Sequence, residues 1–464
     1  MKKNITCIIL CLAALSLSSC KTLFGKYERP DVKTSGIVRD VASDTDTLAV
    51  KDTTTFANIP WRSVFTDPQL QSIIEKGLNN NVNLLNAALN VKMAEEQLKC
   101  AKLAFVPSLS FTPQGTIASW DGNAATKTYS LPVTASWTVD LFGNLLSQKR
   151  SAQMALLQLK DYQVSVQTNL IANIANMYYT LLMLDKQVEL VNNMEGLTKD
   201  TWETMKVLKD TKIGYRGTSV QAAESNYYAV LTQKTDLMRQ IRETENSLSL
   251  LIGDQAHSIA RGKLENQSLP ATFSTGVGIQ LLNNRADVHA AEMNLAQCFY
   301  GIETARSKFY PSITISGTGA FTNSAGAGIV NPGKWLLSAV GSLVQPIFQN
   351  GRIIAGLKVA KMQYEQAYNT WQNTVLKAGS EVSNALVLYN YSDEKGKVEA
   401  KRIAVLEKNV EDTRKLMSEA GGSYLEVIQA QSSLLNVQLS KVADDFYKMQ
   451  AVVNLYYALG GGAK

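Results

Sequence analysis

The sequence predicts an α+β membrane protein in which one structural unit occurs twice in tandem. Three observations support this fold class. Short motifs recur at a nearly constant distance, several segments alternate Ser, Thr and Gly with apolar residues, and two proline-poor stretches of about 70 residues follow a helical period.

The chain begins with a pattern typical of an exported lipoprotein. An apolar run from Ile5 to Leu17 follows two lysines and is too short to span a bilayer comfortably. It ends in Leu17-Ser18-Ser19-Cys20, which resembles a lipobox, the motif in which the cysteine thiol takes diacylglycerol. We expect residues 1–19 to be a signal peptide and residues 20–60 to be the lipidated Cys20 and an extended tether. The alternative is an ordinary secretory signal with a chance cysteine.

Composition argues against several functional classes. The net charge is +6 without a long basic run, so a nucleic-acid partner is not expected. Outside the signal and lipid site only Cys100 and Cys298 remain. They could pair in an oxidising compartment, but no other cysteine is spaced around them, and we expect two unpaired, packed thiols. His257 and His289 stand in no metal-ligand or triad spacing, so no metal site and no catalytic residues are predicted.

Paired carboxylates do not suggest an enzyme either. The pairs Asp444-Asp445 and Glu95-Glu96 are adjacent on predicted helices, so their side chains diverge, unlike the partners of an acid/base pair.

The internal repeat sets the organisation after the tether. Three anchors recur with offsets of 204 (311 minus 107), 206 (348 minus 142) and 207 (421 minus 214). The anchors are Pro107 and Pro311, Phe142 and Phe348, and Gly214 and Gly421. We therefore divide the chain into a first repeat at residues 61–255, a linker at 256–279 and a second repeat at 280–464.

Each repeat is predicted to hold two strands between helices. The strands are expected at Ser108–Ser119, Thr128–Leu141, Ser312–Asn323 and Trp335–Phe348, with polar turns at Asp121-Gly122-Asn123 and from Ser324 to Gly333. Their lengths suit tilted membrane strands, and Trp120, Tyr129, Trp137, Phe321 and Trp335 suit an aromatic girdle. Four strands cannot close a membrane barrel, so several chains would have to share one.

The helices are expected to reach far beyond a bilayer. They are predicted at 67–104, 144–212, 218–252, 280–307, 350–419 and 423–457. A helix of 70 residues is about 100 Å long. The return helix keeps the alternating spacing of a coiled coil at Leu435, Leu439, Val442, Phe446 and Met449.

With these features in place, the chain resembles the TolC-like outer-membrane efflux proteins (outer membrane factors), in the lipoprotein branch that serves resistance-nodulation-division (RND) pumps. The most specific segments are Asp67-Pro68-Gln69-Leu70, Asn284-Arg285-Ala286-Asp287, Pro346-Ile347-Phe348-Gln349-Asn350-Gly351-Arg352 and Leu459-Gly460-Gly461-Gly462. Ala286 stands where the family usually has Pro, and Asn83 where the first repeat often has Asp. Both departures concern helix starts and leave the functional assignment unchanged.

The resemblance implies a homotrimer in the outer membrane. Three sets of four strands would form a twelve-stranded β-barrel that continues into a long periplasmic α-helical barrel. The chain would be the passive exit duct of a tripartite RND-type system, with a periplasmic adaptor and an inner-membrane transporter as partners. No cofactor is expected beyond the lipid on Cys20.

The resemblance also implies a gate at the periplasmic helix turns. The adaptor-docking turns would be Gly214, Tyr215, Arg216 and Gly217, and Gly421, Gly422 and Ser423. Glu426 and Gln429 map to the constriction, where three copies of Glu426 would form an anionic ring. The alternatives are simple helix caps at the turns and a helix-start carboxylate at Glu426.

Two other functional classes stay open. The same architecture serves as the outer-membrane duct of type I protein secretion. A periplasmic coiled-coil lipoprotein without a pore would leave the four alternating segments without a role.

Overall fold

The computed structural model describes residues 25–31, 59–119, 121–211, 217–268, 285–325, 328–419 and 423–463. The chain divides into two compact units. Unit 1 takes its described residues from 25–31, 89–161 and 289–374, and unit 2 from 59–88, 162–288 and 375–463. Both units therefore contain residues of both sequence repeats.

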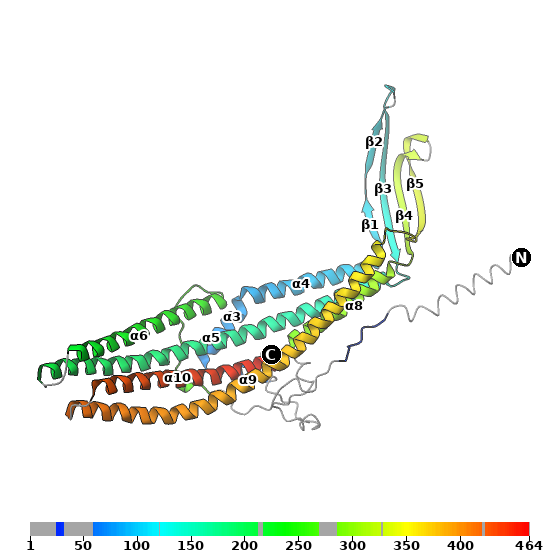
Figure 1. Ribbon diagram of the computed structural model, residues 1–464. Coiled ribbons are helices and arrows are strands. Elements are labelled where there is room, and N and C mark those ends of the chain that lie inside the picture. The colour runs from blue at the N-terminus through cyan, green and yellow to red at the C-terminus, as the bar shows by residue number, and fades with distance from the viewer. Residues whose placement is uncertain are drawn as a thin grey trace. The chain divides into compact units, whose positions relative to one another are not determined.

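Unit 1 contains one antiparallel sheet (Figure 1). Its strands are β1 (Ser108–Phe111), β2 (Gln114–Ala118), β3 (Thr126–Val139), β4 (Ser312–Ala325) and β5 (Gly328–Val344). The order is β1-β3-β4-β5, and β2 also pairs with β3. The strands of the two repeats thus join through β3 and β4.

The predicted strand segments are confirmed with two corrections. The first segment is divided into β1 and β2 at Thr112 and Pro113, because proline has no N–H to donate to the ladder. The long turn expected from Ser324 to Gly333 is wrong, since β4 and β5 continue to pair up to Ala325 and Gly328. A register shift after Thr322 allows this extension, and the Thr322 hydroxyl accepts a hydrogen bond from the Ser324 N–H at 3.1 Å.

The helices follow the predicted order. They are α2 (Trp61–Val64), α3 (Pro68–Asn80), α4 (Val82–Leu103), α5 (Asn144–Thr211), α6 (Gly217–Leu251), α8 (Ala286–Ser307), α9 (Arg352–Glu419) and α10 (Tyr424–Ala458), with a 3₁₀ turn η4 (Leu264–Asn266). α5 and α9 have 68 residues each, which corresponds to about 100 Å.

The helix predicted over 67–104 is broken at Asn81. The Asn81 side chain accepts a hydrogen bond from the Leu84 N–H at 3.0 Å and donates one to the Leu251 carbonyl at 2.8 Å. It therefore caps the start of α4 and ties this start to the end of α6.

Among the described residues, no helix is both long enough and apolar enough to cross a membrane.

Unit 2 has the main hydrophobic core. Its fully buried side chains include Phe65, Leu70, Ile74, Ile174, Tyr178, Leu181, Leu182 and Leu248. Phe65 directly follows α2 and the others come from α3, α5 and α6, while Phe446, Val453 and Tyr456 of α10 complete the same cluster. The core therefore packs helices of the two repeats together.

The segment after α6 is fastened to this core by polar groups. Arg261 makes two hydrogen bonds to Asp185, at 2.5 and 2.9 Å, and one to the buried Glu245 at 2.6 Å. Tyr178 donates to Asp67 at 2.6 Å and accepts from the Gly262 N–H at 3.0 Å. Burial opposes ionisation of Asp67, but the hydrogen bonds it accepts, led by that from Tyr178, hold its pKa below the ordinary value.

A second buried arginine joins the start of α8 to α9 and α10. Arg285 is 3% exposed, donates to Asp287 at 2.7 and 2.9 Å and to the Ala458 carbonyl at 3.0 Å, and forms an ion pair with Glu381 at 2.7 Å. Burial opposes the charge, but Asp287 and Glu381 hold the pKa of the guanidinium above its ordinary value. Arg285 and Asp287 of the family-like segment therefore belong to a structural junction.

In unit 1, a short part of the expected tether lies on α8. Arg29 donates two hydrogen bonds to Glu292, at 2.6 and 2.8 Å, and the Tyr27 ring meets Phe299 edge-on. Cys20 and the rest of the expected tether up to residue 58 lie outside the described residues, apart from this segment. Within the described part of the chain, Cys100 and Cys298 are unpaired as predicted, although Cys100 is exposed and not packed.

Candidate functional site

The sheet of unit 1 has one apolar and one largely hydroxylic face. Residues directly opposite each other on antiparallel strands share a face, so the register of the four paired strands assigns each side chain. One face has Leu109, Phe111, Leu131, Val133, Val139, Ile313, Ile315, Leu337 and Leu343. The other has Ser108, Ser110, Ser130, Thr134, Ser136, Thr138, Thr314, Ser316, Thr318, Ser338 and Ser342, with Leu336, Val340 and Val344 as apolar exceptions on β5.

The apolar face of the sheet is exposed in the single chain. Leu337 is 84% exposed and Trp335 77%. On the opposite face, the hydroxyls of Thr134 and Thr318 lie 3.0 Å apart, within hydrogen-bonding distance. An exposed apolar face backed by a hydroxylic face suits a sheet that separates hydrocarbon from water.

Aromatic side chains mark both ends of the apolar face. Tyr129, Phe321 and Trp335 cluster at one end, with ring centroids 6.1 and 5.7 Å apart. At the other end of β3, the Trp137 indole donates to the Phe105 carbonyl at 3.0 Å. Eight residues separate Tyr129 from Trp137, which is about 26 Å along a strand. In a strand tilted by about 40°, this length spans a height of about 20 Å, which is comparable to the apolar band of an outer-membrane barrel, about 25 Å tall.

The predicted gate residues lie on the first turns of α10. Glu426 and Gln429 are both exposed, and Glu426 belongs to the first turn. Ser423 is the N-cap of α10 without a side-chain capping hydrogen bond, and Gly217 is the first residue of α6. The other predicted turn residues, Gly214, Tyr215, Arg216, Gly421 and Gly422, lie outside the described residues.

The helices above these turns are joined by contacts that the sequence pattern did not reveal. The buried Gln431 amide of α10 donates to the Thr201 hydroxyl of α5 at 2.9 Å. Arg414 of α9 lies 3.7 Å from Asp200 of α5. The only sequence signal for Gln431 is a Val-x-x-Ala-x-Ser pattern that occurs at residues 220–225 and again at 427–432. Its alanines, Ala223 and Ala430, are buried.

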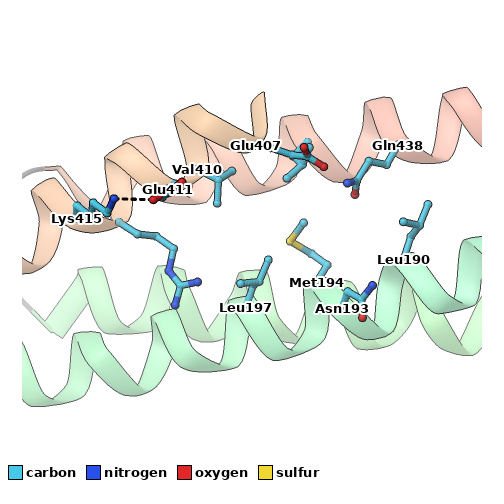
Figure 2. A pocket seen from close by; sticks show the side chains of 11 residues that line it. Leu190, Asn193, Met194, Leu197, Glu407, Val410, Glu411, Lys415 and Gln438 are labelled. Atoms are coloured by element: carbon cyan, nitrogen blue, oxygen red, sulfur yellow. Dashed lines mark hydrogen bonds and ion pairs between the residues drawn. The ribbon is translucent and has the colours of Figure 1, made fainter. Parts of the chain in front are cut away.

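A cavity of about 440 Å³ lies between α5, α9 and α10 in this region (Figure 2). Leu190, Met194 and Leu197 point from α5 towards α9 and α10, which contribute Val410 and Gln438 (Figure 2). Glu407, Glu411, Arg414 and Lys415 supply charged groups around these apolar side chains. A cavity with an apolar lining and charged residues around it can accept the apolar side chains of another helix.

Among the described residues, no group of three or more His, Cys, Asp or Glu side chains is placed to hold a metal ion. His289, which stands in no metal-ligand or triad spacing in the sequence, lies 2.6 Å from Asp161. The hydrogen bond to Asp161 raises the pKa of the imidazole and outweighs partial burial.

Comparison with protein families decides what this architecture is. The family model described as "Outer membrane efflux protein" matches residues 73–254 and again residues 278–461. The chain belongs to the outer membrane efflux protein family. The double match agrees with the internal repeat, and the assignment explains the combination of a two-faced sheet with helices of about 100 Å.

Relatives of this outer membrane efflux protein are similar over almost their whole length. The cation efflux system protein CusC of Escherichia coli K12 is 26% identical over 462 residues, which cover 97% of this chain and 98% of CusC. The probable outer membrane lipoprotein SilC of Salmonella typhimurium is 23% identical, with 96% of each chain covered. The open-state crystal structure of the MtrE outer membrane channel of Neisseria gonorrhoeae has the same fold, with a TM-score of 0.80, 22% identity and coverage of 95% of this chain and 98% of MtrE.

Proposed function

We propose that this outer membrane efflux protein is the exit duct of a tripartite RND-type efflux system and acts as a homotrimer. It would conduct small toxic compounds such as drugs, detergents or metal ions from the transporter and adaptor across the outer membrane, without a chemical step on the cargo. The observation that carries the proposal is the sheet with one exposed apolar face of about 26 Å, joined directly to α5 and α9.

The open edges of the sheet support the trimer. Within the described sheet, β5 pairs with β4 alone, and β1 and β2 pair with β3 alone. Unpaired edges are not tolerated in hydrocarbon, so the edge of one chain must meet the edge of another. Because β1 and β2 follow one line along β3, three chains would contribute twelve strands. Cross-linking and mass measurement in detergent should give trimers, and a purely monomeric protein would contradict this arrangement.

Lipidation of Cys20 belongs to the same proposal. The motif at Leu17–Cys20 supports it, as does the similarity to a relative named as a probable lipoprotein. We expect labelled palmitate to be incorporated into the wild-type protein and not into Cys20→Ala.

The cavity above the helix turns supports engagement by the adaptor. Helices of the adaptor would place apolar side chains against Leu190, Met194, Leu197 and Val410 and would loosen the contact between α5 and α9. Opening of the gate would follow from separation of these helices.

The cargo is tested by accumulation in cells. A strain without this gene should accumulate one class from a panel of dyes, antibiotics, bile salts and metal ions, and complementation should reverse the accumulation. The similarity to a protein named for cation efflux makes metal ions the first class to test. Unchanged accumulation together with loss of a secreted protein would favour the type I secretion duct instead.

Replacement of Arg414 by alanine should favour the open gate. The ion pair with Asp200 is partly exposed, with side-chain exposures of 35% and 63%, so its loss should shift the equilibrium by at most about 1 kcal/mol, or about fivefold. The open fraction is measured as the open probability in single-channel recordings in planar bilayers. The swapped pair Asp200→Arg with Arg414→Asp should restore the wild-type fraction, and an equal increase in the swapped variant would refute the role of this ion pair.

Glu426 should control the charge selectivity of the pore. In Glu426→Gln, the trimer loses three carboxylates from the constriction, so preference for cations and block by a trivalent cation should both weaken several-fold. Gln429→Glu is the matched variant and should act in the opposite direction. If both variants conduct like the wild type while α10 becomes less stable in Glu426→Gln, Glu426 serves only the start of the helix.

A further inference from the structure

Two buried carboxyl groups meet where α9 packs against α10 in unit 2. Glu399 and Lys395 are one turn apart on α9, and Ser440 and Asp444 are one turn apart on α10. The Ser440 hydroxyl donates to Glu399 Oε1 at 2.7 Å. Lys395 Nζ donates to Asp444 Oδ1 at 2.9 Å and lies 3.7 Å from Glu399 Oε1.

The second oxygen of each carboxyl group lacks a donor. Glu399 is 8% exposed and Asp444 is 3% exposed. No donor among the described residues reaches Glu399 Oε2 or Asp444 Oδ2, and both atoms are closed off from solvent within a single chain. A second copy of the chain therefore cannot reach them either. The two carboxyl groups face one ammonium from neighbouring helices, because Lys395 Nζ lies within 4 Å of both.

The charges around the pair do not balance two carboxylates. Among the residues that the structure describes, Lys395 is the single cation that touches both groups. On α10, Lys441 is engaged by Asp445 at 2.5 Å, and its stem lies against Gly396 of α9.

The remaining cations nearby have carboxylate partners of their own. Lys397 and Lys448 both pair with Asp393, and Lys186 of α5 pairs with Glu189 and Glu265. Two ionised carboxylates at the α9–α10 contact would leave one buried negative charge uncompensated, which is costly.

We propose that Glu399 and Asp444 bind one proton between them, so that a carboxyl–carboxylate hydrogen bond joins α9 to α10. The proton occupies the line between Glu399 Oε2 and Asp444 Oδ2 and satisfies both buried oxygens at once. The pair then has one negative charge, which Lys395 neutralises. A metal ion fits this place less well, because the Lys395 ammonium already lies against the same two carboxyl groups and would repel it.

The titration of Glu399 agrees with this arrangement. Burial first, and then Asp444, raise the pKa of Glu399 above its ordinary value of 4.5, while Ser440 and Lys395 act in the opposite direction. A carboxyl group with a raised pKa in the folded state stabilises the fold most at low pH. This stabilisation is lost as the pH rises from 4.5 to the raised value, and it stays lost above that value. The contact between the two helices therefore weakens as the pH rises through this window.

The test is an infrared pH titration of the full-length protein in detergent, read at the C=O stretch of protonated carboxyl groups. Burial also raises the pKa of Glu303, so the signal of the pair is the difference from Glu399→Gln: the wild type should keep one more protonated carboxyl per chain above the ordinary range. Glu399→Gln should lack this band, because its amide donates permanently to Asp444. In Asp444→Asn, the C=O band of protonated Glu399 should disappear at a pH within the ordinary range of carboxyl groups, because the new amide stabilises ionised Glu399. Glu394→Gln, an exposed neighbour on α9, should keep the wild-type titration.

Thermal unfolding supplies a second readout. The stability of the wild type relative to Glu399→Gln should fall as the pH rises through the window and then level off. Two results would overturn the proposal: identical titrations in the wild type and Glu399→Gln, or a band that appears only after EDTA treatment and vanishes when Ca²⁺ or Mg²⁺ is restored. The second result would identify a bound divalent cation in place of the proton.

Discussion

Replacement of Arg285 by alanine is expected to lower the free energy of unfolding by about 3–5 kcal/mol, the usual cost of breaking a buried ion pair by removing one partner. The guanidinium is 3% exposed and joins Asp287, Glu381 and the Ala458 carbonyl. Without it, two carboxylates and one carbonyl lose their partner at the junction of α8, α9 and α10. The loss is measured by chemical unfolding of the purified protein, followed through its helical circular dichroism.

Arg239→Ala provides the matched control for this prediction. Arg239 pairs with Glu243 at 2.7 Å on the surface of α6, where 57% of its side chain is exposed. Solvent screens such a pair, so its removal should leave the unfolding transition unchanged within error. If Arg285→Ala unfolded like Arg239→Ala, the junction would not depend on this arginine. Arg285→Lys should recover only part of the stability, because lysine has no planar fork to contact Asp287 with two hydrogen bonds.

Gly253→Ala is expected to destabilise the protein by about 2–3 kcal/mol, through a strained backbone and a steric clash. Gly253 ends α6 with φ +71°, a left-handed conformation that costs any other L-residue about 1–2 kcal/mol. A Cβ there would also meet the Asn80 carbonyl oxygen at 2.7 Å, and backbone cannot move aside as a flexible side chain can. The measurement is again chemical unfolding.

A second glycine should respond in the opposite sense. Gly196 lies within α5, and a Cβ there would meet no atom within 4 Å. Gly196→Ala should therefore stabilise the helix by about 0.5–1 kcal/mol, because alanine loses less conformational entropy on folding. Equal effects of the two substitutions would show that general helix propensity, and not the conformation at Gly253, decides the outcome.

The elements of the fold followed closely from local patterns. The predicted helix over 144–212 is observed as Asn144–Thr211, and that over 423–457 as Tyr424–Ala458. These segments are long, poor in proline and regular in period, so one local rule determines many consecutive residues. The division at Pro113 also had a local cause, although the prediction treated that strand as continuous.

The errors and omissions arose where partners distant in sequence decide the outcome. The break at Asn81 depends on the Leu251 carbonyl, 170 residues away, and the extension of β4 depends on its register with β5. No local pattern paired Glu399 with Asp444 or Arg414 with Asp200, because each pair exists only after helices have packed. The sequence pattern relates Asp444 only to its neighbour Asp445, whereas its partners in the fold are on α9.

The sequence by itself determined the duplication and the succession of strands and long helices. It also carried the resemblance that the family comparison confirmed. The lipoprotein signal stays a prediction. These features depend on periodicity and motif, which are properties of neighbouring residues. Only the tertiary structure decided which strand faces share an apolar surface, which arginines are buried, and where two carboxyl groups compete for one lysine. These features depend on the register of strands and on contacts between helices, where burial and the lack of water make each unpaired charge or clash costly.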